Sequence, residues 1–264
     1  SLGKAATFIM TNDFTVPPAD ADPSQNGTAN ENGSRQAING YHKVSEHIFE
    51  LFPHFTKAKG SVGNKTLIHH AAFRHAASST DGGEDLSSKA FEILLQSHPE
   101  AANELDSMGA TALHWATRNK SMTKDVLMTL LRANPNAPMV KDQTGYLPIH
   151  WAVCQDEPSE VIVQTLLTAY PEGLLKPCVD GTLPLHWCVN RCKPKVKIVK
   201  MLLDANKSSA GVSDNDGCTP LHKCVNREDP DVEVAQMLID ACAEALEITN
   251  KEGHLPLHLA IDHD

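Results

Sequence analysis

The chain has 264 residues, of which 41% are hydrophobic and 21% are charged, and its formal net charge is −10. This acidic balance argues against nonspecific nucleic-acid binding, which needs a concentrated basic surface. No apolar run approaches the roughly 18 residues of a membrane span, so we expect neither a nucleic-acid partner nor direct membrane insertion.

Residues 1–40 are rich in Asn, Asp, Pro, Thr, Gly and Ala and show no helical period. Such a segment buries too little apolar surface to order itself, so an extended or disordered arm is predicted. A short apolar cluster interrupts it and is a candidate anchor, to the rest of the chain or to another subunit: Phe8, Ile9, Met10 and Phe14. The apolar residues that follow predict a capping helix at about 44–52.

One phrase then recurs along the chain, first complete as Gly109-Ala-Thr-Ala-Leu-His-Trp-Ala. Its histidine returns every 36 residues, at His114, His150, His186, His222 and His258. A degenerate copy carries His69, 45 residues before His114. This spacing exceeds the period of 36 by nine residues, which are placed in a predicted surface loop around Ser78–Leu86.

Each repeat is predicted to contain a turn and two helices. Asp and Gly suit the turn, and Pro148, Pro184, Pro220 and Pro256 suit the first turn of the first helix. Pro158, Pro194 and Pro230 are placed at the start of the second helix, whose apolar residues form one stripe.

A single unit of this kind cannot bury its own apolar stripe, so the units must stack. The predicted fold is therefore an all-α solenoid over residues 41–264. It contains the capping helix, five full repeats and a partial sixth repeat at 253–264.

The repeat resembles that of ankyrin-repeat proteins, whose Thr-Pro-Leu-His stands intact at Thr219–His222. The period of 36 residues exceeds the family's roughly 33. The sequence after the second helix, for example Tyr170-Pro171-Glu172-Gly173, resembles ankyrin repeats abundant in diatoms and their relatives. Leucine replaces threonine at Leu147, Leu183 and Leu255, which removes a Thr–His hydrogen bond there. The resemblance implies a curved stack with β-turn fingers that binds other proteins on its concave side.

The resemblance also implies that the recurring histidines form structural hydrogen bonds between turns. Adjacent repeats lie about 10 Å apart, whereas zinc holds its nitrogens at about 2.0–2.1 Å, so successive histidines cannot share one ion. Cys188 is expected to face the core, which argues against a zinc site with His186 and Cys192. We therefore expect no metal and no cofactor.

The three tryptophans Trp115, Trp151 and Trp187 each follow a recurring histidine. Either they pack between neighbouring helices, or they are exposed and supply aromatic anchors for a partner. In the second case the candidate surface extends to Tyr146, Thr182, Lys223 and His254.

A dense basic run occupies Arg191, Lys193, Lys195, Lys197 and Lys200. One repeat away on either side lie acidic residues, Asp156, Glu157 and Glu160 before it and Asp229, Asp231 and Glu233 after it. The basic run is thus predicted to pair internally with neighbouring repeats, the alternative being docking of an acidic partner.

No phosphate-binding loop, paired carboxylates or nucleophile motif stands at a convincing spacing. The expected function is therefore that of a non-catalytic scaffold or adaptor that binds a protein partner on the concave and finger surface. Two alternatives stay open: an accessory or structural subunit of a large multi-protein complex, such as an organellar membrane complex, tethered by its N-terminal arm, and the regulatory segment of a longer enzyme.

The compartment is inferred from the cysteines. All seven lie between Cys154 and Cys242, and an odd number in one part of the chain is unlike a disulfide framework. Ser1 opens the sequence without a secretory signal pattern. We therefore expect a reducing intracellular compartment, cytoplasmic, or organellar if a leader has been removed.

Overall fold

The computed structural model of the chain describes residues 65–74, 91, 94–96, 99–119, 122–191 and 194–261. The N-terminal arm with Phe8, Ile9, Met10 and Phe14, the capping helix at 44–52 and the loop at Ser78–Leu86 lie outside these residues. Every regular element with defined bounds in the described part is an α-helix or a 3-10 helix.

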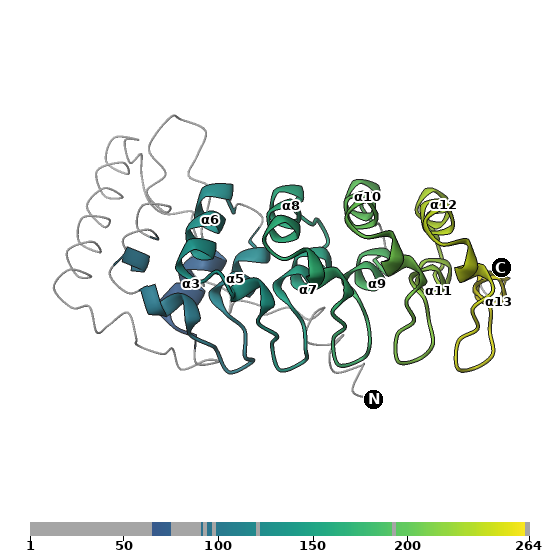
Figure 1. Ribbon diagram of the computed structural model, residues 1–264, viewed down its shortest axis with the longest axis horizontal. Coiled ribbons are helices and arrows are strands. Elements are labelled where there is room, and N and C mark those ends of the chain that lie inside the picture. The colour runs from purple at the N-terminus through teal and green to yellow at the C-terminus, as the bar shows by residue number, and fades with distance from the viewer. Residues whose placement is uncertain are drawn as a thin grey trace, which may run out of the picture.

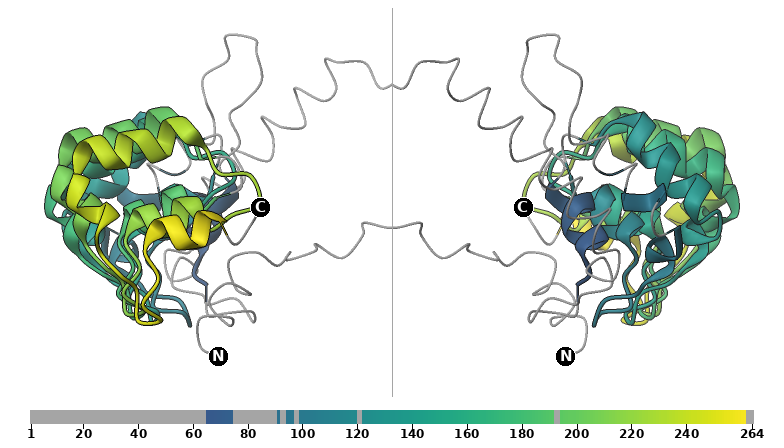
Figure 2. Two further views of the ribbon diagram at one scale, coloured as in Figure 1. Left: turned by 90° about the vertical axis from the view of Figure 1, so that its right-hand side faces the viewer. Right: turned by 90° about the vertical axis from the view of Figure 1, so that its left-hand side faces the viewer.

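The helices form two parallel rows with a row of turns projecting from one edge (Figure 1). The first-helix row consists of α3 (Leu67–Arg74), α5 (Ala112–Thr117), α7 (Pro148–Val153), α9 (Pro184–Val189), α11 (Pro220–Val225) and α13 (Pro256–Ile261). The second-helix row contains α6 (Lys124–Ala133), α8 (Glu160–Ala169), α10 (Val196–Ala205) and α12 (Val232–Ala241). Viewed along the stack, successive helices overlie one another and the turns project together (Figure 2), so the predicted all-α solenoid is confirmed.

Proline fixes where the first helices begin. Pro148, Pro184, Pro220 and Pro256 are each the first helical residue, as predicted, because a missing N–H costs nothing there. The second helices begin two residues later than predicted, at Glu160, Val196 and Val232 rather than at the preceding prolines. Each of these prolines lies just before the helix N-cap, which in the last case is Asp231, whose side chain accepts a hydrogen bond from Val234 N at 3.1 Å.

A 3-10 helix follows the second helix of each repeat and leads the chain into the next turn. The bounds of these 3-10 helices are Pro99–Asn103 (η2), Ala137–Met139 (η3), Pro171–Leu175 (η4), Lys207–Gly211 (η5) and Ala243–Leu246 (η6). They were not predicted from the sequence.

One apolar core runs through the described repeats. On α8 the stripe of Ile162, Val163 and Leu166 is at most 1% exposed, and each such side chain contributes about 1.5–3 kcal/mol by leaving water. The neighbouring repeat provides much of the cover: Leu221 is 1% exposed, whereas Leu257, one repeat later, is 64% exposed. The stacking of repeats, rather than any single repeat, therefore creates the core.

Candidate partner-binding surface

Four of the projecting turns, here called fingers, are each folded by one acidic or amide side chain. Asp142 Oδ1 accepts hydrogen bonds from the backbone N–H groups of Thr144 and Tyr146, both at 2.9 Å. Gly145 closes the turn with φ at +79°, a conformation that side chains disfavour. Asp106, Asp214 and Asn250 bind their own fingers in the same way.

Neighbouring fingers are joined by single backbone hydrogen bonds. The donors and acceptors are Gln143 N to Met108 O, Val179 N to Thr144 O, Asn215 N to Asp180 O and Lys251 N to Asp216 O, at 2.8–3.1 Å. The finger row is therefore a continuous hydrogen-bonded unit rather than a set of independent loops.

The recurring histidines form a ladder inside the stack. Their Nε2 atoms lie 3.1 Å from a carbonyl oxygen of the next repeat, in the pairs His69–Ala110, His114–Tyr146, His186–Cys218 and His222–His254. The first bond forms although nine additional residues separate His69 from Ala110. His150 has the same position, but its buried Nε2 makes no hydrogen bond. His258 is exposed on α13.

The other ring nitrogen fixes the tautomer. Nδ1 of His114 and His150 accepts the backbone N–H three residues earlier at 3.1 Å, and that of His258 does so at 2.9 Å. The proton therefore lies on Nε2. Thr111 Oγ1 adds a second bond to His114 Nδ1 at 3.0 Å, which Leu147 cannot supply to His150.

These rings are held uncharged. Burial lowers the pKa of His114 and of His186 to about 4 and that of His150 to about 3, although nearby carbonyl oxygens act in the opposite direction. A neutral ring with one donor and one acceptor suits a structural link.

Trp115 and Trp151 are buried and do not form exposed anchors for a partner. Trp115 is 5% exposed and Trp151 is 3% exposed, and the edge of one ring packs on the other with centroids 5.4 Å apart. Tyr146 and Thr182 are buried as well, with Tyr146 only 1% exposed. The packing alternative is therefore the correct one for Trp115 and Trp151, because each ring fills the space between successive first helices.

Trp187, Lys223 and His254 are half-buried and are the candidates that reach the surface. Lys223 takes the tryptophan position in its repeat, and its Nζ pairs with Asp214 Oδ2 at 2.8 Å. Burial acts to lower the pKa of Lys223, but the hydrogen bond and charge of Asp214 outweigh it and the pKa is raised. His254 Nδ1 lies 3.5 Å from Glu252 Oε2.

Each buried tryptophan is held by the acid of its own finger. Trp115 Nε1 donates to Asp106 Oδ2 and Trp151 Nε1 donates to Asp142 Oδ2, both at 2.9 Å. This pairing was not predicted from the sequence. The signal that could have found it is the joint occurrence of Asp and Trp nine residues apart in successive repeats.

One repeat departs from this rule. Cys178 stands where the acid is expected, and Trp187 Nε1 donates instead to Thr182 Oγ1 at 3.0 Å, whose hydroxyl also lies 2.7 Å from Cys178 Sγ. The neighbouring Tyr146 hydroxyl is buried without a hydrogen bond. Since a thiol is a weak hydrogen-bonding group, this finger lacks the acceptor that its neighbours have.

Cations lie over the tryptophan rings. Lys65 Nζ is 3.6 Å from the centre of the Trp115 ring, and the Arg118 guanidinium is 5.8 Å from that of Trp151. Burial lowers the pKa of Lys65, while the charge of Asp106 acts in the opposite direction. Such contacts contribute about 0.5–2 kcal/mol. They add to the burial of the two rings and leave less of each ring for a partner.

The basic run pairs with the preceding repeat, as predicted. Arg191 forms an ion pair with Asp156, Lys197 Nζ lies 2.5 Å from Glu160 Oε2, and Lys195 Nζ donates to Pro158 O at 3.3 Å. At least one partner of each ion pair, Asp156 or Lys197, is largely exposed, so each pair contributes at most about 1 kcal/mol. Internal pairing on this side reduces the charge available to an acidic partner.

Three buried cysteines have thiols that stay protonated. Burial raises the pKa of the Cys154 and Cys224 thiols to about 11 and that of Cys188 to about 12, so these thiols are protonated near neutral pH. No group of three or more His, Cys, Asp or Glu side chains in this part of the chain could hold a metal ion. None of its helices is both long and apolar enough to cross a membrane.

The comparisons with known proteins identify the repeat. The family profile for ankyrin repeats (3 copies) matches residues 75–176 and 185–264, which is more than half of the chain, and the chain therefore belongs to the ankyrin-repeat family. No curated protein sequence matches it.

Two of the solved structures that are similar to this chain illustrate the fold. The crystal structure of the ankyrin repeat domain of Bcl-3, a unique member of the IkappaB protein family, has a TM-score of 0.63 and 18% identity, covering 86% of this chain and 90% of that one. The human ASB11 ankyrin repeat domain has a TM-score of 0.61 and 21% identity, covering 83% and 90%. Ankyrin repeats generally mediate protein–protein interaction and are typically non-catalytic.

Proposed function

We propose that this chain is a non-catalytic adaptor that binds a protein partner along its finger row. The observation that carries the proposal is the set of backbone hydrogen bonds joining successive fingers at 2.8–3.1 Å. A surface already ordered in this way loses little conformational entropy when a partner binds.

The exposed residues of the fingers suggest the chemistry of the partner. Val179 is 66% exposed at the end of its finger. Asp180, Asp216 and Glu252 recur at the same position of three successive fingers, the first half-buried and the others exposed. The proposed partner therefore presents lysine or arginine side chains to these carboxylates around a small apolar contact.

Charge reversal tests the proposal. The finger variant combines Asp180→Lys, Asp216→Lys and Glu252→Lys. The matched control makes the same change of charge at exposed positions of α10 and α12, with Asp204→Lys, Glu233→Lys and Asp240→Lys. Tagged chains are used to capture partners from native extract, with quantitative mass spectrometry as the readout.

We expect the wild type and the control to enrich the same protein and the finger variant to lose most of it. The association rate with the purified partner should also fall as salt is raised, because steering by exposed charges is screened. Equal enrichment by all three chains would contradict binding through the fingers.

A further inference from the structure

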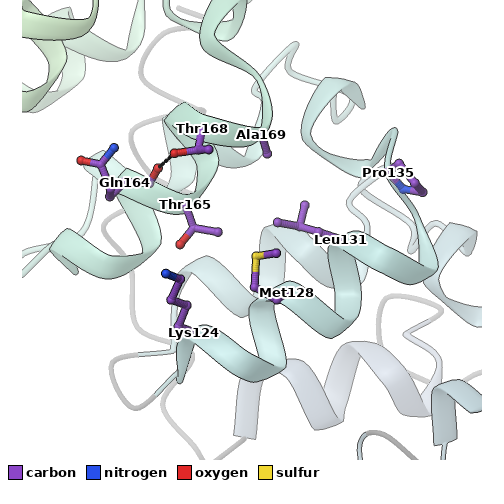
Figure 3. Close-up of a pocket in the computed structure, with 8 residues that line it drawn as sticks. All are labelled: Lys124, Met128, Leu131, Pro135, Gln164, Thr165, Thr168 and Ala169. Carbon is purple, nitrogen blue, oxygen red and sulfur yellow. Dashed lines mark hydrogen bonds between the residues drawn. The ribbon is translucent and has the colours of Figure 1, made fainter.

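The second-helix row carries a groove that the finger surface does not include. A hollow of about 430 Å³ lies between α6 and α8 (Figure 3), with Met128 and Leu131 on one side and Thr165 and Ala169 on the other. Lys124 lines the end nearest the start of α6.

Two positions of this groove differ from their equivalents in later repeats. Met128 on its wall is replaced by Gln164 and then Lys200 at successive intervals of 36 residues. Thr165 occupies a position at which the next two repeats carry Met201 and Met237, both packed against the core. The short side chain of Thr165 therefore leaves space on this wall of the groove.

The hydroxyl and backbone groups of the groove offer no hydrogen bonds to an extended peptide. Thr165 Oγ1 donates to Val161 O at 2.7 Å and Thr168 Oγ1 to Gln164 O at 2.9 Å, so these hydroxyls are bound within α8. The walls are helices whose backbone groups are already paired. Apart from the side chains of Gln164 and Lys124, an extended chain would find few partners there for its own N–H and C=O groups, whereas a helix satisfies them internally.

The length of the groove also suits a helix. Lys124, Met128 and Leu131 follow one another at i, i+4 and i+7 along α6, a span of about 10 Å. Apolar side chains at i, i+3 or i+4, and i+7 are the pattern by which amphipathic helices lie in grooves.

Charge gives the orientation of the occupant. Among the described residues no ion pair forms at Lys124, whereas Lys197 on α10 pairs with Glu160. A carboxylate beside the apolar stripe of the occupant would find its counter-ion at Lys124.

We propose that this groove binds an amphipathic α-helix of a partner protein, with the apolar stripe of that helix along α6 and α8 and an acidic side chain at Lys124. The proposal rests on the protein-binding function and adds a second contact surface, on the second-helix row.

The test uses the full chain and a fluorescent panel of helix-stabilised peptides of about 15 residues. Each peptide carries apolar residues at i, i+4 and i+7, varied among Leu, Ile, Phe and Met, and a Glu one turn before the first. Anisotropy titration should show saturable binding by at least one peptide, and none by versions with the apolar residues scattered around the helix.

Two variants should weaken that binding for different reasons. Thr165→Met fills the groove with a side chain that two other repeats accommodate, and should weaken binding at least about tenfold while circular dichroism stays unchanged. Lys124→Glu should weaken it about fivefold or more, with the difference shrinking at high salt. The matched controls Thr129→Met, one repeat earlier, and Lys200→Glu, outside the hollow, should bind within about twofold of wild type.

Absence of binding by the whole panel, or undiminished binding by Thr165→Met, would overturn the proposal. Binding of the fluorescent fatty acid cis-parinaric acid that Thr165→Met abolishes, without peptide binding, would show that the groove takes a lipid chain instead. The finger charge-reversal variant should still bind the peptides, so failure of the groove and failure of the finger surface are distinguishable.

Discussion

Removing the carboxylate of Asp142 should lower the free energy of unfolding more than removing the carboxylate of an exposed acidic residue would. This side chain joins a finger to a tryptophan: Oδ1 accepts the N–H groups of Thr144 and Tyr146, and Oδ2 accepts the indole N–H of Trp151. Asp142 is 8% exposed, so water cannot readily replace it. Asp142→Ala would leave two buried donors, Tyr146 N and Trp151 Nε1, without acceptors.

The magnitude follows from those two donors. A buried donor left unsatisfied costs about 1–3 kcal/mol, so Asp142→Ala should lower the free energy of unfolding by about 4 kcal/mol. Asp142→Asn should cost less, about 1–3 kcal/mol. Its amide oxygen can still fold the finger, as that of Asn250 does by accepting Glu252 N and His254 N, and only the indole bond is lost.

Urea unfolding followed by circular dichroism and tryptophan fluorescence measures these differences on the full chain. The indole N–H of Trp151 should also exchange faster with solvent in both variants. Asp216→Ala is the matched control, because Asp216 lies exposed on the next finger but one, and it should change the stability by less than about 0.5 kcal/mol. A cost for Asp142→Ala no greater than that of the control would refute the assigned role of the buried acid.

Three further changes should have measurable effects. The pKa of His114 is lowered from about 6.5 to about 4. The neutral ring therefore contributes stability that is complete above about pH 6.5 and is lost as the pH falls towards 4. Thermal unfolding midpoints that are equal at neutral pH and at pH 5 would contradict this. Cys178→Asp should restore the missing acceptor and raise the free energy of unfolding by about 1–2 kcal/mol in urea titrations, and a destabilised variant would show that the thiol site cannot hold a carboxylate. Gly145→Ala should lower the free energy of unfolding more than Gly253→Ala does in the same assay. Both residues have a positive φ of about +80°, but only at Gly145 would the new methyl group meet a backbone nitrogen, Val179 N at 2.9 Å. Equal losses would mean that the neighbouring finger moves away from the methyl group at no cost.

The stack itself could be predicted because its signals are local and repeated. Pro148 at a fixed distance before His150 sets the first helix, and the stripe of Ile162 and Leu166 sets the second, so each repeat supports the interpretation of the others. The exposure of Trp151 could not be predicted in this way. Its helix has six residues, all of them buried, and therefore shows no polar face from which an orientation could be inferred.

The candidate surface was harder to predict than the fold because its contacts are tertiary. The indole of Trp151 is fixed by an acid nine residues earlier, across the whole finger. Similarly, the cation over the Trp115 ring comes from Lys65, 50 positions away in the chain. Helical periodicity carries no information about such pairs, whereas comparison of the same position between repeats does.

The histidine ladder has a consequence for how such a chain can change in length. The hydrogen bonds of His114, His186 and His222 each join the ring to a backbone carbonyl 32 residues later, at the equivalent position of the next repeat. An in-frame duplication or loss of one 36-residue block would bring an equivalent histidine and carbonyl together at the new junction. Recombination between genes could thus lengthen or shorten the molecule while preserving hydrogen bonds of this kind between its repeats.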